Sequence, residues 1–99
     1  MEITANQLQE KLNNNEKVIV EFWAEWCGPC KMMKPVFEKV ASANTSDYGM
    51  FTMNIEENKE YAMSLGIKSI PTVKVFGDGQ VIDTKVGVMN ESQIKSLII

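Results

Sequence analysis

The chain has 99 residues, 44% of them hydrophobic, and a formal net charge of −3. Its length suits one small domain covering residues 1–99, and its composition is that of a folded globular protein. The mild negative charge provides no basic face for nucleic acid and no polybasic anchor for a membrane. Neither a transmembrane stretch nor the basic and apolar regions of a signal peptide are visible, so we expect a cytoplasmic protein.

The first half of the chain predicts a helix, a buried strand and a second helix. Thr4 and Gln7 form a capping box at the start of the first helix, and the asparagine run 13–15 ends it. Residues 17–23 are nearly all apolar, which is typical of a strand buried on both faces. A second helix should follow and end near residue 43, because apolar side chains recur close to one helical face.

The middle of the chain predicts two strands separated by a short helix. Residues 50–55 form the first of these strands. The helix should cover about 58–65, with Gly66 as its C-terminal stop. Residues 72–76 then form the second strand.

The end of the chain predicts a hairpin and a last helix. The run 77–79 (Gly-Asp-Gly) turns the chain, and 80–86 returns antiparallel with side chains that alternate in a period of two. Asn90 with Gln93 caps the last helix, whose apolar face is Ile94, Leu97 and Ile98. Strands that alternate with helices favour parallel pairing, and the closing hairpin makes the sheet mixed, so the class is α/β.

The two cysteines, Cys27 and Cys30, lie where the buried strand turns into the second helix. Unpaired N–H groups at a helix N-terminus stabilise negative charge, which favours a thiolate on Cys27. Pro29 suits the first turn, where its missing N–H costs little. This placement favours a redox role; an inert structural disulfide and half of a zinc site are the alternatives. The chain has no histidine, which excludes Cys–His and Ser–His–Asp catalysis.

The segment Phe22-Trp23-Ala24-Glu25-Trp26-Cys27-Gly28-Pro29-Cys30-Lys31 resembles the active-site segment of the thioredoxin family. Further similar segments follow in the same order: Asn54-Ile55-Glu56, 61–66, Ser69-Ile70-Pro71-Thr72, Gly79 and Gly87. The resemblance implies the thioredoxin fold, a central mixed sheet with helices on both faces, in the order β-α-β-α-β-α-β-β-α. Thioredoxins have a strand before the first helix. Here only Glu2-Ile3 remain for it, so this strand should be short.

The resemblance also implies a division of labour between the cysteines. Cys27 should be exposed and attack a substrate disulfide, while Cys30, one helical turn inward, should be shielded and resolve the mixed disulfide. The Ile70–Pro71 bond should be cis and leave the backbone of Ile70 free to pair with a substrate strand. An apolar surface around Cys27 should bind protein substrates. Its expected members are Trp26, Gly28, Pro29, Ile70, Pro71, Gly87 and Val88.

Glu21 and Thr52 depart from the family pattern, in which these positions usually hold an aspartate and a lysine. The strand around Glu21 is apolar, so its carboxyl should be buried and its pKa raised above the ordinary value of about 4.3. Such a group could pass protons to and from Cys30. As alternatives, Lys74 could replace the missing cation, or the carboxyl could point into a wet crevice and only fill space. Lys34 looks like a solvated charge.

These features predict a protein dithiol–disulfide oxidoreductase that reduces protein disulfides through a reversible Cys27–Cys30 disulfide. By resemblance it needs no cofactor or metal, acts as a monomer, and is recycled by a thioredoxin reductase linked to NADPH or ferredoxin. Its other partners would be disulfide-containing client proteins. The alternative is a redox-independent binding subunit that uses the thioredoxin surface. Such a role should survive replacement of both cysteines by serine.

Overall fold

A computed structural model of the chain describes residues 1–98. Helices and strands alternate along the first three quarters of the chain, and a hairpin and a short helix close it. The elements are α1 (Ala5–Asn13), β1 (Val18–Trp23), α2 (Gly28–Ala43), β2 (Gly49–Asn54), α3 (Lys59–Ser64), β3 (Thr72–Gly77), β4 (Gln80–Val86) and α4 (Glu91–Lys95), followed by a 3₁₀ turn at Ser96–Ile98.

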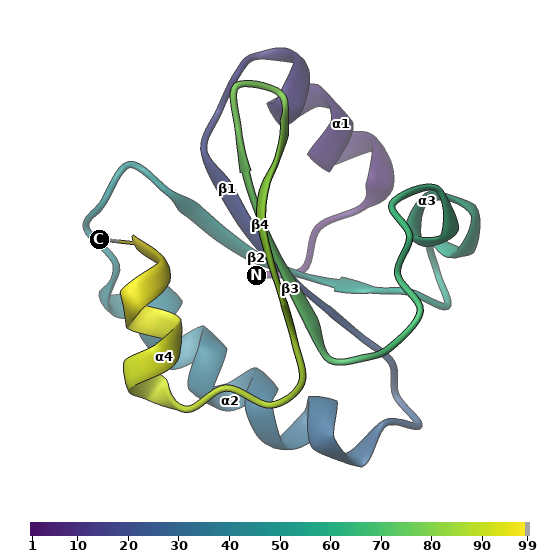
Figure 1. The fold of residues 1–99 in the computed structure, drawn as a ribbon, viewed down its shortest axis with the longest axis vertical. Coiled ribbons are helices and arrows are strands. Elements are labelled where there is room, and N and C mark those ends of the chain that lie inside the picture. The colour runs from purple at the N-terminus through teal and green to yellow at the C-terminus, as the bar shows by residue number, and fades with distance from the viewer. Residues whose placement is uncertain (99) are drawn as a thin grey trace.

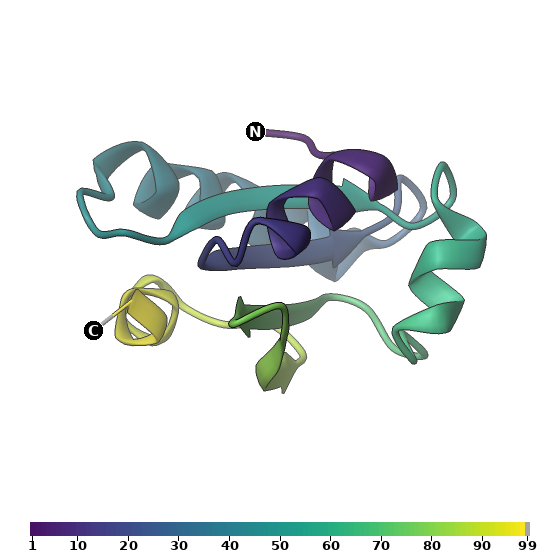
Figure 2. The same cartoon turned by 90° about the horizontal axis from the view of Figure 1, so that it is seen from above.

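The four strands form one mixed sheet in the order β2-β1-β3-β4. β1 runs parallel to β2 and antiparallel to β3, and β3 runs antiparallel to β4. The mixed sheet is therefore confirmed, although β3 opposes its neighbour β1 rather than following the parallel pairing that strand–helix alternation favours. The predicted first strand is reduced to a single parallel bridge between Glu2 and Thr52. In Figure 2 the N-terminal segment lies on the β2 side of the sheet, opposite the β3–β4 hairpin.

The helices cover both faces of the sheet, with α2 and α4 on one side and α1 and α3 on the other (Figure 1). Successive side chains of β1 point to opposite faces of the sheet, so β1 contributes to the hydrophobic core on each face. One core cluster joins β1 and β3 to α2 and α4, and consists of Ile19, Met33, Phe37, Val40, Met50, Val73, Val75, Met89 and Ile94. The other packs under α1 and contains Ile3, Leu8, Leu12, Val18, Val20, Phe22, Met53 and Phe76. The expectation that β1 is buried on both faces is confirmed.

Local signals at the helix ends are also confirmed. Thr4 caps α1 through a capping box with Gln7, and Asn90 caps α4 through one with Gln93. These side chains accept hydrogen bonds from backbone N–H groups that have no partner within the helix. Gly66 follows α3 with φ +73°, a conformation that glycine adopts without steric cost.

β4 returns antiparallel to β3 over residues 80–86, as predicted. All seven of its residues are exposed, so the period of two marks no buried face. β4 is the outermost strand and pairs only with β3, and the flanking helices leave both of its faces to solvent. Val81, Ile82 and Val86 are 40%, 53% and 66% exposed.

Candidate functional site

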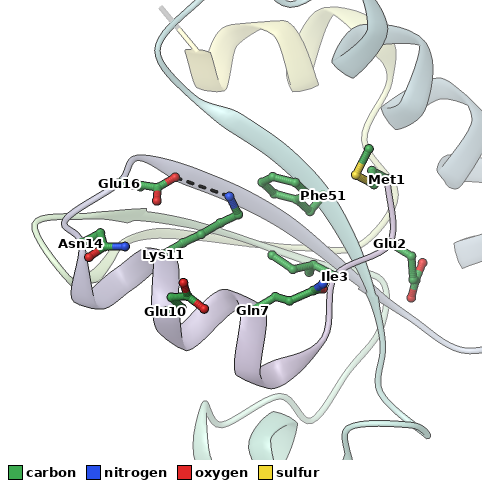
Figure 3. A pocket seen from close by; sticks show the side chains of 9 residues that line it. All are labelled: Met1, Glu2, Ile3, Gln7, Glu10, Lys11, Asn14, Glu16 and Phe51. Atoms are coloured by element: carbon green, nitrogen blue, oxygen red, sulfur yellow. Dashed lines mark hydrogen bonds and ion pairs between the residues drawn. The ribbon is translucent and has the colours of Figure 1, made fainter.

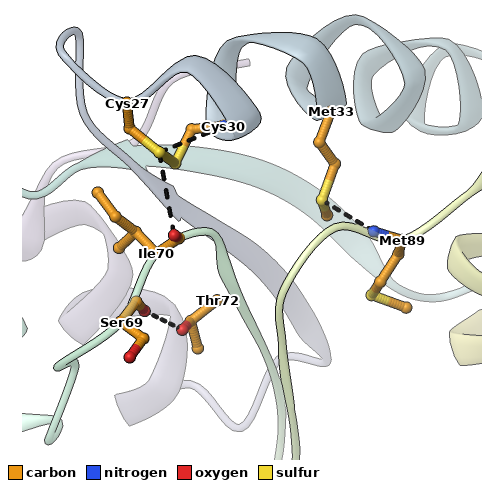
Figure 4. The surroundings of a disulfide bond; sticks show 7 residues. All are labelled: Cys27, Cys30, Met33, Ser69, Ile70, Thr72 and Met89. Carbon is orange, nitrogen blue, oxygen red and sulfur yellow. Dashed lines mark hydrogen bonds between the residues drawn. A yellow bond between two sulfur atoms is a disulfide. The ribbon is translucent and has the colours of Figure 1, made fainter.

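Cys27 and Cys30 form a disulfide at the point where β1 leads into α2 (Figure 4). Cys27 is the N-cap of α2, and its Sγ accepts the backbone N–H of Cys30 at 3.3 Å. Pro29 lies in the first turn, where the helix needs no N–H from it. The sulfur of Cys27 is therefore placed where unpaired helical N–H groups favour a thiolate once the disulfide is reduced.

The two cysteine residues differ in solvent exposure less than expected. Cys30 is fully buried, as predicted, but Cys27 is only 6% exposed, which corrects the expectation of an exposed residue. The cause is close packing: Trp23, Ala24 and the two cysteines form one cluster, against which Ile70 also packs. Cys27 is nevertheless the one residue of the pair that keeps any exposed area.

The segment before β3 lies directly against the disulfide. The Ile70–Pro71 peptide bond is cis, as predicted. The carbonyl oxygen of Ile70 lies 3.9 Å from Cys27 Sγ, a contact that a reduced thiol could close as S–H···O. The Thr72 hydroxyl donates to the Ser69 carbonyl and ties the two ends of this segment together (Figure 4).

The apolar surface expected around Cys27 is only partly exposed. Trp26 is 67% and Val88 57% exposed. Gly28 and Pro29 are exposed and Ile70 and Gly87 half-buried, but Pro71 is buried and does not contribute to the exposed surface. The Gly87 N–H donates to the Pro71 carbonyl at 2.8 Å, which holds the two segments of this surface together.

Glu21 has the environment that the sequence predicts. It is 0% exposed, and neither carboxyl oxygen has a hydrogen-bond partner within residues 1–98. Burial raises the pKa of Glu21 to about 8; Lys34 opposes this shift, while Glu38 and Glu2 add to it. The carboxyl therefore does not open onto a solvent-exposed crevice.

Lys74 does not serve Glu21. It pairs with Val20 across β1 and β3, whereas Glu21 pairs with Val73. Because directly paired residues lie on the same face of a sheet, Lys74 and Glu21 lie on opposite faces. The Lys74 ammonium donates to the Thr84 hydroxyl at 3.2 Å instead.

A cluster around Glu2 stands beside Glu21, and the sequence did not indicate it. The Glu2 carboxylate accepts the Thr52 hydroxyl at 2.6 Å, the Asn54 N–H at 2.8 Å, and the Trp23 indole N–H at 3.2 Å to each oxygen. The ammonium of Lys34 lies 3.9 Å from Glu2 and 3.8 Å from the centroid of the Trp23 ring. Lys34 is thus not simply a solvated charge: its ammonium lies over the indole, and its charge opposes the rise in the pKa of Glu21.

Among the hollows on the surface of residues 1–98, one lies near Lys34 and another near the N-terminal segment. A small one of about 180 Å³ is lined by Trp23, Glu25, Lys31, Lys34, Pro35 and Glu38. A larger cleft of about 320 Å³ lies between α1 and β2 and contains none of the predicted site residues (Figure 3).

Within residues 1–98, no group of three His, Cys, Asp or Glu side chains is arranged to hold a metal ion. None of the helices in this range is long and apolar enough to cross a bilayer.

Comparison with known proteins gives one consistent result. A family model described as "Thioredoxin" matches residues 1–99. A thioredoxin of Pyropia yezoensis is 40% identical over 90 residues, which is 91% of this chain and 84% of the relative. A thioredoxin of Pseudomonas aeruginosa is also 40% identical over 90 residues, covering 91% and 83%. The crystal structure of Malassezia sympodialis thioredoxin superposes with a TM-score of 0.84 and 36% identity, covering 96% of this chain and 85% of that one.

Proposed function

The chain belongs to the thioredoxin family and is a thiol–disulfide oxidoreductase with a redox-active cysteine pair, and we propose that it reduces client disulfides with Cys27 as nucleophile and Cys30 as resolving thiol. The observation that carries this assignment is the N-cap position of Cys27, whose sulfur accepts the Cys30 N–H. Helical N–H groups lower a thiol pKa at that position, and the thiolate is the attacking form.

The reaction balances within the cysteine pair and the client. The Cys27 thiolate attacks one sulfur of the client disulfide, forms a mixed disulfide and releases the other client sulfur as a thiolate. The Cys30 thiolate then attacks Cys27 Sγ, displaces the second client thiolate and closes the Cys27–Cys30 disulfide. The client gains two electrons, and the protein must be reduced again before the next cycle.

Glu21 is proposed as the group that takes the Cys30 proton. Its carboxyl is buried on the α2 side of β1 and has a pKa of about 8, so near neutral pH it exchanges protons readily. Glu21→Gln should slow disulfide reduction most at the pH where the carboxylate would accept that proton.

Clients are proposed to bind at the apolar surface beside Cys27. Trp26 and Val88 are its exposed large side chains, Gly28 and Pro29 are also exposed, Ile70 and Gly87 are half-buried, and Pro71 is buried beneath the surface. An extended client segment could pair with the backbone of Ile70. Members of this family work in general with a reductase and with disulfide-bearing clients. We propose a monomeric electron carrier that forms one domain over residues 1–99, acts in the cytoplasm, and is recycled by an NADPH- or ferredoxin-linked reductase.

Alkylation and trapping test the two cysteine roles. In the reduced protein, iodoacetamide should modify Cys27 first, as read by mass mapping, while Cys30 stays protected. Cys30→Ser should accumulate mixed disulfides with clients, because the resolving thiol is gone. Replacing both cysteines by serine is the control and should trap nothing. Earlier alkylation of Cys30 would reverse the assignment.

A further inference from the structure

Residues 87–89, here called the rim loop, are held at both ends. At the first end, the Gly87 N–H donates to the carbonyl of Pro71 at 2.8 Å. At the second, the Met89 N–H donates to the thioether sulfur of Met33 at 3.4 Å, and the Met89 side chain is itself buried (Figure 4). Val88, between these anchors, is 57% exposed. Val88 is thus held at the surface between two residues whose backbone N–H groups are hydrogen-bonded.

The second anchor connects the rim loop to the helix that carries the cysteines. Met33 follows Cys30 by three residues in α2, so the two side chains lie on the same helical face. Met33 is 1% exposed and belongs to the same core cluster as Met89. A thioether is a weak acceptor, but here it is the only partner found within residues 1–98 for a buried backbone N–H, and leaving such a donor unpaired is costly.

We propose that Met33 is a positioning residue for protein clients, whose sulfur fixes the rim loop against α2 and so sets Val88 beside the cysteine pair. This inference rests on the proposed client surface. Met33 should therefore contribute to the binding of a protein client, which is large enough to contact the rim loop. It should not affect the reduction of a small disulfide, which contacts only the sulfurs of Cys27 and Cys30.

Met33→Leu tests this, because leucine has a similar volume and no acceptor atom. For insulin as the client, KM should rise about two- to fivefold, because a hydrogen bond to a weak thioether acceptor contributes at most as much as one ordinary hydrogen bond, with kcat unchanged. For glutathione disulfide neither constant should move. The Met89 amide should exchange with solvent faster by about the same factor, as read by NMR. Met53→Leu is the matched control, since Met53 is equally buried but lies in the cluster under α1.

The outcomes separate this inference from the function on which it rests. Val88→Ser should raise the KM for insulin; if it does not, the rim loop binds no client and both proposals about this surface fail. If Val88→Ser raises KM while Met33→Leu behaves like Met53→Leu, only the role of Met33 is overturned. If Met33→Leu impairs the reduction of glutathione disulfide as much as that of insulin, the substitution acts at the cysteines, and the proposed role of Met33 is again overturned. Should Met33→Leu not fold, the wild-type protein decides: a Met89 amide that exchanges as fast as that of Val88 contradicts the proposal, and a protected one supports it.

Discussion

Glu21 carries an ionisable group into a part of the sheet where the neighbouring residues of β1 are buried on both faces. Its raised pKa has a consequence for stability. Between about pH 4.5 and 8 the folded protein keeps this proton and the unfolded chain releases it. The contribution of Glu21 to stability is therefore largest below pH 4.5 and falls as the pH rises towards 8. The buried carboxyl is costly at the pH where it would act on Cys30, which fits a group kept for its chemistry rather than for the fold.

Glu21→Gln should remove this pH dependence. At pH 5 the variant and the wild type should be similarly stable, because the glutamate is protonated and neutral. By pH 8 the variant should have gained about 3 kcal/mol relative to the wild type. Urea unfolding across that range measures the difference. Glu10→Gln, which changes the same charge at an exposed position of α1, should follow the wild-type profile. A constant offset between Glu21→Gln and the wild type at every pH would contradict the predicted titration.

Lys34→Met should raise the pKa of Glu21 further. The ammonium of Lys34 is the one nearby group whose charge favours the carboxylate of Glu21, and methionine keeps much of the stem that packs over Trp23. Titration of a ¹³C-labelled Glu21 carboxyl by NMR gives the shift directly. Lys39→Met removes a lysine from the same helix at an exposed ion pair with Glu91 and should leave the Glu21 titration in place. A lower pKa in Lys34→Met would show that this cation does not act on Glu21.

At the scale of elements, the helix boundaries follow from short-range chemistry. α1 and α4 both begin with a capping box, and each box lies within four consecutive residues. Such signals can be read from sequence because donor and acceptor are neighbours in the chain. The exposure of β4 on both faces could not be predicted in this way. Its alternation is a property of the strand, whereas its exposure depends on its place at the edge of the sheet.

Thr4→Ala should cost about 1 kcal/mol of stability, because the Gln7 N–H loses its acceptor. The change lies at the N-cap of α1, a helix that covers the face of the sheet away from α2 (Figure 1). The rate of disulfide reduction should therefore be unchanged. Thermal unfolding measures the loss. Thr45→Ala, at an exposed loop position, should have no comparable effect. Equal stability of the two variants would mean that the cap contributes nothing here.

At the scale of the whole molecule, the cysteine pair, its helix and the burial of Glu21 could all be predicted, because a strand, a turn and a helix adjacent in sequence build them. The Glu2 cluster could not. Glu2 joins Trp23 and Thr52 across 21 and 50 residues, and no local pattern connects such positions. The link between Met33 and Met89 spans 56 residues and was missed for the same reason. A methionine in the sequence also gives no sign of such a hydrogen bond, because buried methionines ordinarily fill the core.

The Glu2 cluster predicts that a residue near the start of the chain stabilises the whole fold. The carboxylate of Glu2 joins the N-terminal segment to both β1 and β2, where the predicted first strand is reduced to one bridge. Glu2→Ala would leave the buried Thr52 hydroxyl and the Trp23 indole N–H without this acceptor. Each unpaired buried group costs about 1–3 kcal/mol, so a loss of about 2 kcal/mol is a conservative expectation.

Urea unfolding followed by tryptophan fluorescence measures this loss. It should be done at pH 6, where Glu21 is protonated in the folded protein, so that the change in its pKa does not add to the result. Glu2→Gln keeps an oxygen acceptor and should recover part of the stability, while the exposed Glu10→Ala controls for the removal of a carboxylate. If Glu2→Ala were as stable as Glu10→Ala, water would be replacing the carboxylate at no cost. The N-terminal segment would then add nothing to the sheet beyond its backbone bridge.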